Sequence, residues 1–195
     1  MHYNYDLAAE KSVDGTDTPH SLVVNYIYSL PIGRGKMIGN NMSRAVNSVA
    51  GGWQVSGITS LKSGIPLGIT GGGNSNLFGG NQRPNVIGNP HLDHKTINEW
   101  FNTQAFAPAA PYTFGDVPRY FSNLRAPGYA NWDTAIEKYW YLPKELRLQG
   151  RAEFYNVFNH PNFYAPDTNL TDGSFGTIRQ AFGSRSIQFA MKLYW

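Results

Sequence analysis

Five ionisable residues recur two or four positions apart within two neighbouring segments, and they are the first candidates for acid–base chemistry. They are Asp133, Glu137, Arg147, Arg151 and Glu153. Carboxylates beside cations can act as general acid and general base. Residues two apart also line one face of a β-strand, so neighbouring strands form such a polar ladder by default. We interpret the five residues as a ladder that faces water, and we expect no enzymatic activity.

Other motifs that could bind a ligand are incomplete. His91 and His94 have the spacing of a metal-binding pair, but no third ligand accompanies them. Gly71-Gly72-Gly73 is typical of a phosphate cradle, but no Lys-Ser/Thr pair follows to complete it. We therefore expect no metal and no cofactor. Aromatic residues in segment 71–128 either stack on a sugar-like substrate or pack the segment on itself; the candidates for substrate contact are Phe78, Trp100, Phe114 and Tyr120.

The elements that must carry these residues alternate between apolar and polar positions. At the C-terminus the apolar positions are Ile187, Phe189, Met191, Leu193 and Trp195. Period-two alternation is the pattern of a β-strand between an apolar and a polar medium. Further segments of this kind are 21–30, 53–70, 131–142 and 146–158, with 2–8 as a sixth. We predict an all-β fold, an antiparallel up-and-down meander of about six strands, with residues 97–102 as the only helical candidate.

The connections between these strands differ greatly in length. Residues 143–145 form a tight turn, whereas residues 71–128 and 159–182 form long connections rich in Gly, Asn and Pro. Long loops are uncommon in compact domains, but outer-membrane barrels alternate short periplasmic turns with long extracellular loops. If Trp195 is periplasmic, counting strands backwards places both long connections outside the cell and the tight turn in the periplasm.

Composition argues against several classes of protein. Only 15% of the 195 residues are charged, against about 25% in typical soluble domains, and the net charge is +3. This weak, scattered charge does not indicate nucleic-acid binding. No segment approaches the ~18 apolar residues of a membrane helix, and the N-terminus lacks the pattern of a signal peptide. The chain contains no cysteine for disulfides or thiolate sites.

Alternation alone fits both a membrane barrel and a soluble β-sandwich. Rows of ionisable residues suit a wet barrel interior, and Tyr and Trp near strand ends suit an interfacial aromatic girdle. These features favour the membrane. The alternative is a secreted or surface-exposed soluble β-sandwich that binds carbohydrate or mediates adhesion through its aromatic loops. A small barrel assembled from several copies of the chain is a third option.

Charge predicts how the strands pair across the tight turn. A three-residue loop, 143–145, places Glu137 opposite Arg151 and Asp133 opposite Tyr155. The pair of opposite charges would contribute roughly 0.2–1 kcal/mol. A five-residue loop would instead place Asp133 opposite Glu153, two like charges. We therefore predict the three-residue loop.

Several blocks of the sequence occur in an order known from one family of transporters. They are "PHSLVVNYIYSLPIGRGK", "GGWQVSGITSLKSGIPLGIT", "WFNTQAF", "GRAEFYNVFNHPNF", "FGTI" and "RSIQFAMKLYW". Together they resemble the C-terminal barrel of TonB-dependent outer-membrane transporters, and most closely the Oar-like group, which carries a carboxypeptidase-regulatory-like domain and a plug. The resemblance implies a 22-stranded transmembrane β-barrel. Residues 1–195 would be its C-terminal segment, without plug, regulatory-like domain or signal peptide.

The resemblance also implies a function, a location and partners. The family takes up bulky nutrients, such as siderophores or glycans, across the outer membrane of Gram-negative-type bacteria with energy from the TonB complex. The implied partners are outer-membrane lipid, the remainder of the barrel with its plug, and the barrel-assembly machinery. That machinery would read a C-terminal signal comprising Phe189, Met191, Leu193 and Trp195. About six strands cannot close such a barrel, so we expect the segment alone to transport nothing.

Overall fold

The computed structural model describes residues 10–72 and 83–195, which divide into two compact units. The first, here the strand unit, comprises Ser21–Leu61, Ala130–Pro161 and Gly183–Trp195. The second, here the loop unit, comprises Lys62–Tyr129 and Asn162–Phe182 together with the described residues before Ser21.

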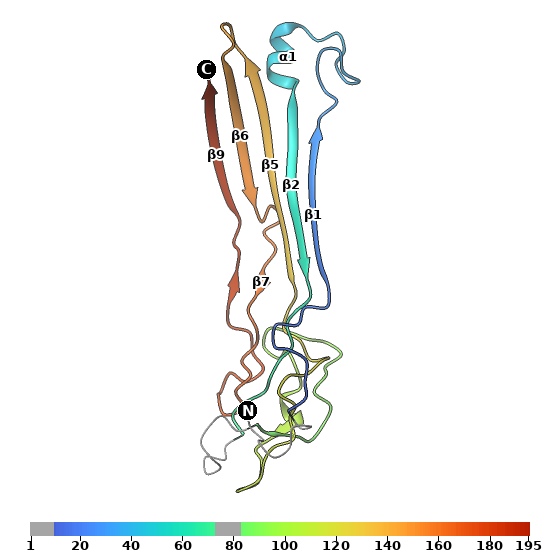
Figure 1. The fold of residues 1–195 in the computed structure, drawn as a ribbon, viewed down its shortest axis with the longest axis vertical. Helices are drawn as coiled ribbons and strands as arrows, with labels where there is room; N and C mark the ends of the chain where they lie inside the picture. Colours follow the sequence, from blue (N-terminus) through green and yellow to red (C-terminus); the bar gives the residue numbers. More distant parts are fainter. Residues whose placement is uncertain (1–9, 73–82) are drawn as a thin grey trace. The chain divides into compact units, whose positions relative to one another are not determined.

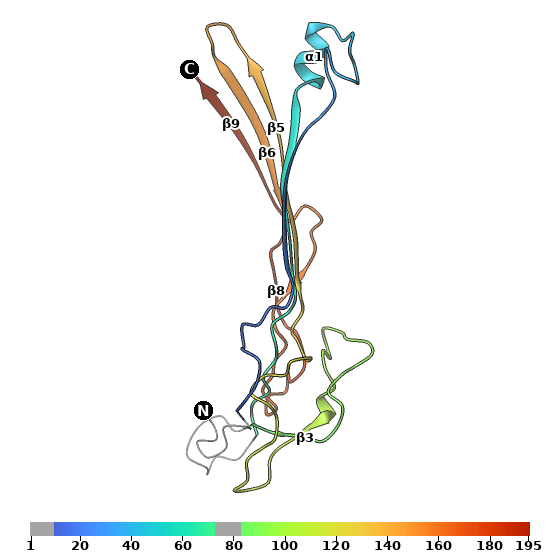
Figure 2. The same ribbon diagram turned by 45° about the vertical axis from the view of Figure 1, so that its right-hand side comes forward.

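Five long strands form the sheet of the strand unit. Their order β1-β2-β5-β6-β9 follows the chain, and Figure 1 shows each strand running opposite to its neighbours. Figure 2 shows that the sheet curves along its length. The predicted all-β antiparallel meander is therefore confirmed for five strands, whereas segment 2–8 lies outside the described residues. The bounds are Ser21–Ser29 for β1, Trp53–Lys62 for β2, Tyr129–Tyr141 for β5, Arg147–Tyr155 for β6 and Ser186–Tyr194 for β9.

The turn between β5 and β6 sets the register of these two strands. The Leu142 amide donates to the Leu146 carbonyl at 2.8 Å, which leaves the predicted three-residue loop, 143–145. Lys144 and Glu145 adopt φ angles of 63° and 62° to close it. Glu137 then lies directly opposite Arg151, as predicted.

The predicted partnership of Asp133 with Tyr155 lies one step beyond the β5–β6 ladder. The ladder's last pair is Thr134 with Phe154. Next to it, the Asp133 carboxylate accepts a hydrogen bond of 2.9 Å from the backbone amide of Asn156. Asn156 has a φ of 49°, and its side-chain amide donates to the carbonyls of His160 and Gly183. Asp133 thus helps to end β6.

Two predictions about secondary structure are wrong. The strand predicted over 53–70 ends at Lys62, and beyond it Pro66 and Thr70 form only isolated bridges. Proline has no amide hydrogen to continue a ladder, so a regular strand does not run through Pro66 to Thr70. Residues 97–102 are not helical; instead helix α1 spans Arg44–Ala50, with the Ser43 hydroxyl accepting from the Val46 amide at 3.3 Å.

Helix α1 has no long apolar stripe, so periodicity does not reveal it. It lies in the connection between β1 and β2. A single 3₁₀ turn, η1, spans Thr103–Ala105 in the loop unit. No helix among the described residues is long and apolar enough to cross a membrane.

The loop unit folds around its own apolar core. Four phenylalanine rings meet edge to face there, with centroids 5.1–6.0 Å apart; they are Phe101, Phe106, Phe121 and Phe175. Two short sheets frame the unit, β3 (Asn85–Val86) with β4 (Phe106–Ala107) and β7 (Asn162–Phe163) with β8 (Ala181–Phe182). The long connections of the chain therefore contain a packed core rather than loose coil.

Candidate functional site: the two faces of the sheet

One face of the sheet is apolar, and it is exposed on β9 and partly exposed on β5 and β6. The registers of β5, β6 and β9 place Ile136, Ala152 and Phe189 side by side on it, and the odd positions of β9 continue it. Phe189 is 81% exposed and Met191 74%, while the other odd positions of β9 are also exposed. Within the described part of the chain, this apolar face is not the inside of a core.

The lengths of the five strands fit a membrane. They contain 9, 10, 13, 9 and 9 residues in chain order. A tilted strand needs about 9–11 residues to cross the hydrocarbon layer of a bilayer. Each strand is therefore long enough to cross a membrane with its apolar face toward lipid.

The opposite face carries a connected polar network. Arg151 bonds Glu137 at 3.2 Å and Glu153 at 2.7 Å, so one guanidinium joins two carboxylates on two strands. Gln149 donates to Glu137 at 2.8 Å, and the Tyr194 hydroxyl donates to Gln149 at 3.0 Å. The network therefore reaches from β5 across β6 to β9.

Glu153 is the second centre of this network. Its carboxylate accepts from Tyr155 at 3.1 Å and from the side-chain amide of Gln188, besides Arg151. The carboxylates of Glu137 and Glu153 thus both accept hydrogen bonds. These bonds hold the polar side chains of this face in place. Arg147, the remaining cation of the predicted ladder, lies 5.4 Å from the ring centroid of Tyr194.

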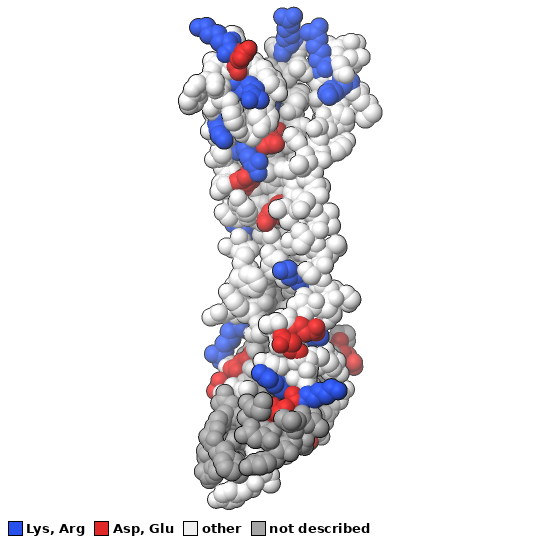
Figure 3. All heavy atoms as spheres, in the orientation of Figure 1, with Lys and Arg blue, Asp and Glu red and all other residues white. Residues whose placement is uncertain are grey.

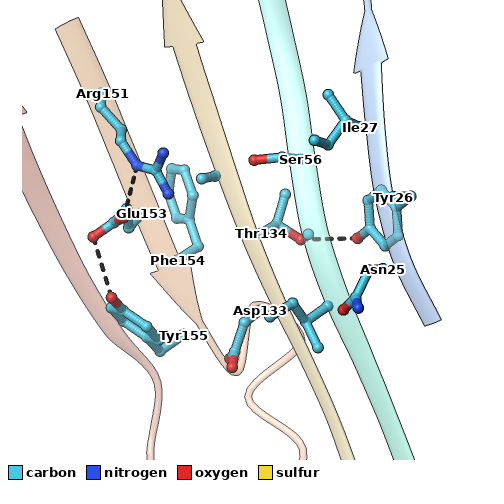
Figure 4. Close-up of a pocket in the computed structure, with 13 residues that line it drawn as sticks. Asn25, Tyr26, Ile27, Ser56, Asp133, Thr134, Arg151, Glu153, Phe154 and Tyr155 are labelled. Atoms are coloured by element: carbon cyan, nitrogen blue, oxygen red, sulfur yellow. Dashed lines mark hydrogen bonds and ion pairs between the residues drawn. The ribbon is translucent and has the colours of Figure 1, made fainter. Parts of the chain in front are cut away.

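A concavity of about 440 Å³ opens beside this network. It is lined from β1, β2, β5 and β6 by polar residues such as Asn25 and Asp133 and by apolar ones such as Ile27, Ile58 and Phe154. Figure 4 shows Arg151, Glu153 and Tyr155 following one another along β6. The structure therefore brings Asp133, Glu137, Arg151 and Glu153 to one face, as the sequence pattern predicts.

Tyr26 shows why one residue of β2 must be glycine. The hydroxyl end of its side chain lies over Gly57 of β2, and the hydroxyl meets the Thr134 hydroxyl at 3.4 Å, as Figure 4 shows. A Cβ atom at Gly57 would lie 2.4 Å from that tyrosine oxygen and 2.6 Å from the Asp133 carbonyl oxygen. Glycine thus lets an aromatic side chain of β1 lie across β2 and reach β5.

Lys138 is a residue of this site that sequence reasoning missed. It lies on the apolar face of β5 yet is only 2% exposed. Its ammonium donates to the carbonyls of Gly51 and Val49, the latter at 3.2 Å, and lies 5.5 Å from the ring centroids of Trp53 and Trp140. The available signal was a single cation between Ile136 and Trp140, which interrupts the apolar alternation of the strand.

The described aromatic residues predicted to contact a substrate, Trp100, Phe114 and Tyr120, belong to the loop unit. Trp100 packs on the apolar core, and its indole donates to the Arg125 carbonyl at 2.7 Å. Tyr120 lies against Gly15, whereas Phe114 is 39% exposed. Phe78 lies outside the described residues. Substrate contact by any of them stays a prediction.

The incomplete motifs of the loop unit have local structural roles. Gly71 has a φ of 84°, and a Cβ atom there would lie 2.0 Å from the side-chain oxygen of Asn169. A close approach between two chain segments therefore explains this glycine. The backbone amide of His91 donates to the Asn89 side chain at 3.1 Å. Across residues 10–72 and 83–195, no three His, Asp or Glu side chains are grouped to hold a metal ion.

An exposed apolar face, a hydrogen-bonded polar face and strands of membrane-spanning length define the wall of a transmembrane β-barrel. The sequence model of the family described as "Outer membrane beta barrel domain" matches residues 1–188, and the chain belongs to this family. It is therefore a protein of the outer membrane. Neither a curated protein nor a solved structure matches the chain.

Membership of this family and the exposed apolar face both argue against the soluble β-sandwich. A β-sandwich would cover Ile187, Phe189 and Leu193 with a second layer, but all three are about half exposed or more. The soluble β-sandwich does not fit these observations.

Proposed function

We propose that the chain forms part of the barrel wall of a TonB-dependent receptor of the Oar-like group, which takes up a bulky nutrient of the siderophore or glycan type. The wall itself is a scaffold and not an enzyme. Its polar network would face the aqueous interior and the plug, and its apolar face would contact outer-membrane lipid. The observation that carries the proposal is the sheet with one exposed apolar and one hydrogen-bonded polar face, combined with the sequence blocks shared with these receptors.

The edges of the sheet support a larger barrel. Among the described strands, β1 and β9 each pair on one side only. Unpaired backbone groups are costly in lipid, so both edges require further strands. Twenty-two strands in all, closed around a plug, would satisfy them. We infer that residues 1–195 are the C-terminal segment of that barrel and do not transport alone.

The direction of the strands suggests an orientation. Both long connections, 63–128 and 156–185, join strand ends opposite to the end that carries the 143–145 turn. Placing long connections outside the cell puts the turn and Trp195 in the periplasm. In this orientation the exposed positions Phe189, Met191, Leu193 and Trp195 form the C-terminal signal for the barrel-assembly machinery.

Growth and uptake test the proposed transport. We expect deletion of the gene to abolish uptake of at least one siderophore or glycan, with recovery on complementation. A protonophore or loss of the TonB complex should abolish the same uptake in the complemented strain, because transport draws on inner-membrane energy. Uptake that persists with the protonophore would contradict a TonB-dependent function, while heat-modifiable gel migration would separately test for a closed barrel.

A further inference from the structure

Residues 31–52, which lie in the connection between β1 and β2, are here called the α1 segment. It is held together by its own hydrogen bonds. The Arg34 amide donates to the Asn47 side chain at 2.6 Å, and the amide of Ile38 donates to the Pro31 carbonyl at 2.9 Å. The segment is therefore a folded structure that presents its side chains in fixed positions.

The α1 segment is docked on the apolar face of the sheet. The Trp140 indole donates to the Ser48 carbonyl at 2.7 Å, and the Trp53 indole donates to the Val49 carbonyl at 2.9 Å. Lys138 adds its ammonium to the carbonyls at the end of α1. Trp140 and Lys138 share the face of Ile136, which register places beside Ala152 and Phe189. The helix therefore lies on the side of the wall that faces lipid.

The outward side of the α1 segment is apolar. Val49 is 70% exposed, Val46 51%, Met37 80% and Ile38 49%. Val46 and Val49 are three residues apart in the helix and share one face of it. These side chains add apolar surface just where the sheet already presents one to lipid.

Every charged residue of the α1 segment is basic. Arg34, Lys36 and Arg44 are all exposed, and residues 31–52 contain no Asp or Glu. Figure 3 shows Lys and Arg gathered at the end of the strand unit that carries α1. Apolar side chains beside exposed cations are the combination by which a peripheral helix lies in the headgroup region of a bilayer with anionic lipid.

We propose that the α1 segment is a lipid-binding element. Met37, Val46 and Val49 insert among the acyl chains at the boundary of the leaflet next to the β5–β6 turn, and Arg34, Lys36 and Arg44 bind anionic phospholipid headgroups. Lys138 holds the helix against the wall at that depth. This inference rests on the proposed barrel, because it takes the apolar face as the lipid-facing one.

Fluorescence quenching tests the proposal in protein isolated from outer membranes and reconstituted in vesicles. This chain has no cysteine, so a fluorophore can be attached at one introduced cysteine at a time. The probe position is Val49→Cys, with Phe189→Cys as the lipid reference and Asn25→Cys as the water reference. Quenching by lipids with a nitroxide on the acyl chain is compared with quenching by aqueous iodide, in phosphatidylethanolamine vesicles with phosphatidylglycerol.

We expect the label at position 49 to be quenched by the nitroxide lipid, like the label at 189. Changing Arg34, Lys36 and Arg44 to Gln should make this label more accessible to iodide. Each cation removed should lower the equilibrium constant for insertion of the segment about fivefold. Vesicles of phosphatidylcholine alone should have the same effect on the unchanged segment. The control, Lys144→Gln, removes an exposed cation of the β5–β6 turn outside the segment and should change the quenching little.

The references separate failure of this proposal from failure of the barrel. A label at 49 quenched by iodide, with the label at 189 still quenched by lipid, would overturn the lipid-binding element alone. Lipid quenching at 49 that ignores both lipid charge and the Gln substitutions would overturn headgroup binding. Iodide quenching at 189 would overturn the barrel wall and this proposal with it.

Discussion

Phe101 and Leu124 in the loop unit are fully buried, whereas Phe189 and Met191 in the strand unit are 81% and 74% exposed. Both units bury some polar side chains, but among the described residues the strand unit buries only one apolar side chain, Ala135. The hydrophobic effect drives apolar side chains away from water but not away from lipid. Apolar side chains therefore lie inside a unit that water surrounds and on the outside of a unit that lipid surrounds. Comparing the two units thus indicates which part of the chain each medium surrounds.

The largest effect is expected in the core of the loop unit. Phe101→Ala removes a fully buried ring that contacts Phe106 and Phe175, and should lower the free energy of unfolding of this unit by about 3–5 kcal/mol. Hydrogen exchange of loop-unit amides measures it. Ile87→Ala, at a side chain 65% exposed, is the control and should cost under about 0.5 kcal/mol. Equal effects of the two substitutions would contradict a core in which apolar side chains are buried away from water.

A charge on the lipid face should be the next most costly change. Phe189→Lys places an ammonium near the middle of β9 on the apolar face, and should destabilise the folded barrel by about 2–4 kcal/mol. Urea unfolding in lipid vesicles measures this cost. The neighbouring Gln188→Lys points to the polar face, where Glu153 can pair with it, so its cost should be far smaller. A similar cost at both positions would show that the two faces meet the same medium.

Removing the buried cation of β5 should loosen helix α1. Lys138→Met leaves the carbonyls of Val49 and Gly51 without this donor, at a cost of about 1–3 kcal/mol. Faster hydrogen exchange in residues 44–52 is the expected sign. Lys62→Met, at the exposed end of β2, should leave that exchange unchanged. Unchanged exchange in Lys138→Met would show that the two Trp residues hold the helix without it.

The smallest effect is expected in the polar network. Glu137→Gln removes one charge of the pair with Arg151, but Glu153 still binds the same guanidinium. The substitution should therefore cost only about 0.2–1 kcal/mol in urea unfolding. A cost above that of Phe189→Lys would mean that the pair is in a water-free environment and not beside an aqueous interior.

The strands and the β5–β6 register could be predicted because their causes are local. Period-two alternation marks each strand, and charge across a three-residue loop places Glu137 opposite Arg151. The core of the loop unit could not be predicted, since Phe101 and Phe175 meet across more than seventy residues with no repeating pattern. Helix α1 was missed because it is short. Its contact with Lys138 was missed because the lysine's partners are backbone carbonyls distant in sequence.

The most direct test of the account is a scan of β9 with spin labels. Nitroxides attached to single introduced cysteines at each position from Ser186 to Tyr194, in protein reconstituted in lipid vesicles, report collision with oxygen in lipid or with a nickel chelate in water. A barrel wall between lipid and water predicts strict alternation, with Ile187, Phe189, Met191 and Leu193 open to oxygen and the even positions open to nickel. Equal access along the strand, or oxygen access at the even positions, would contradict it.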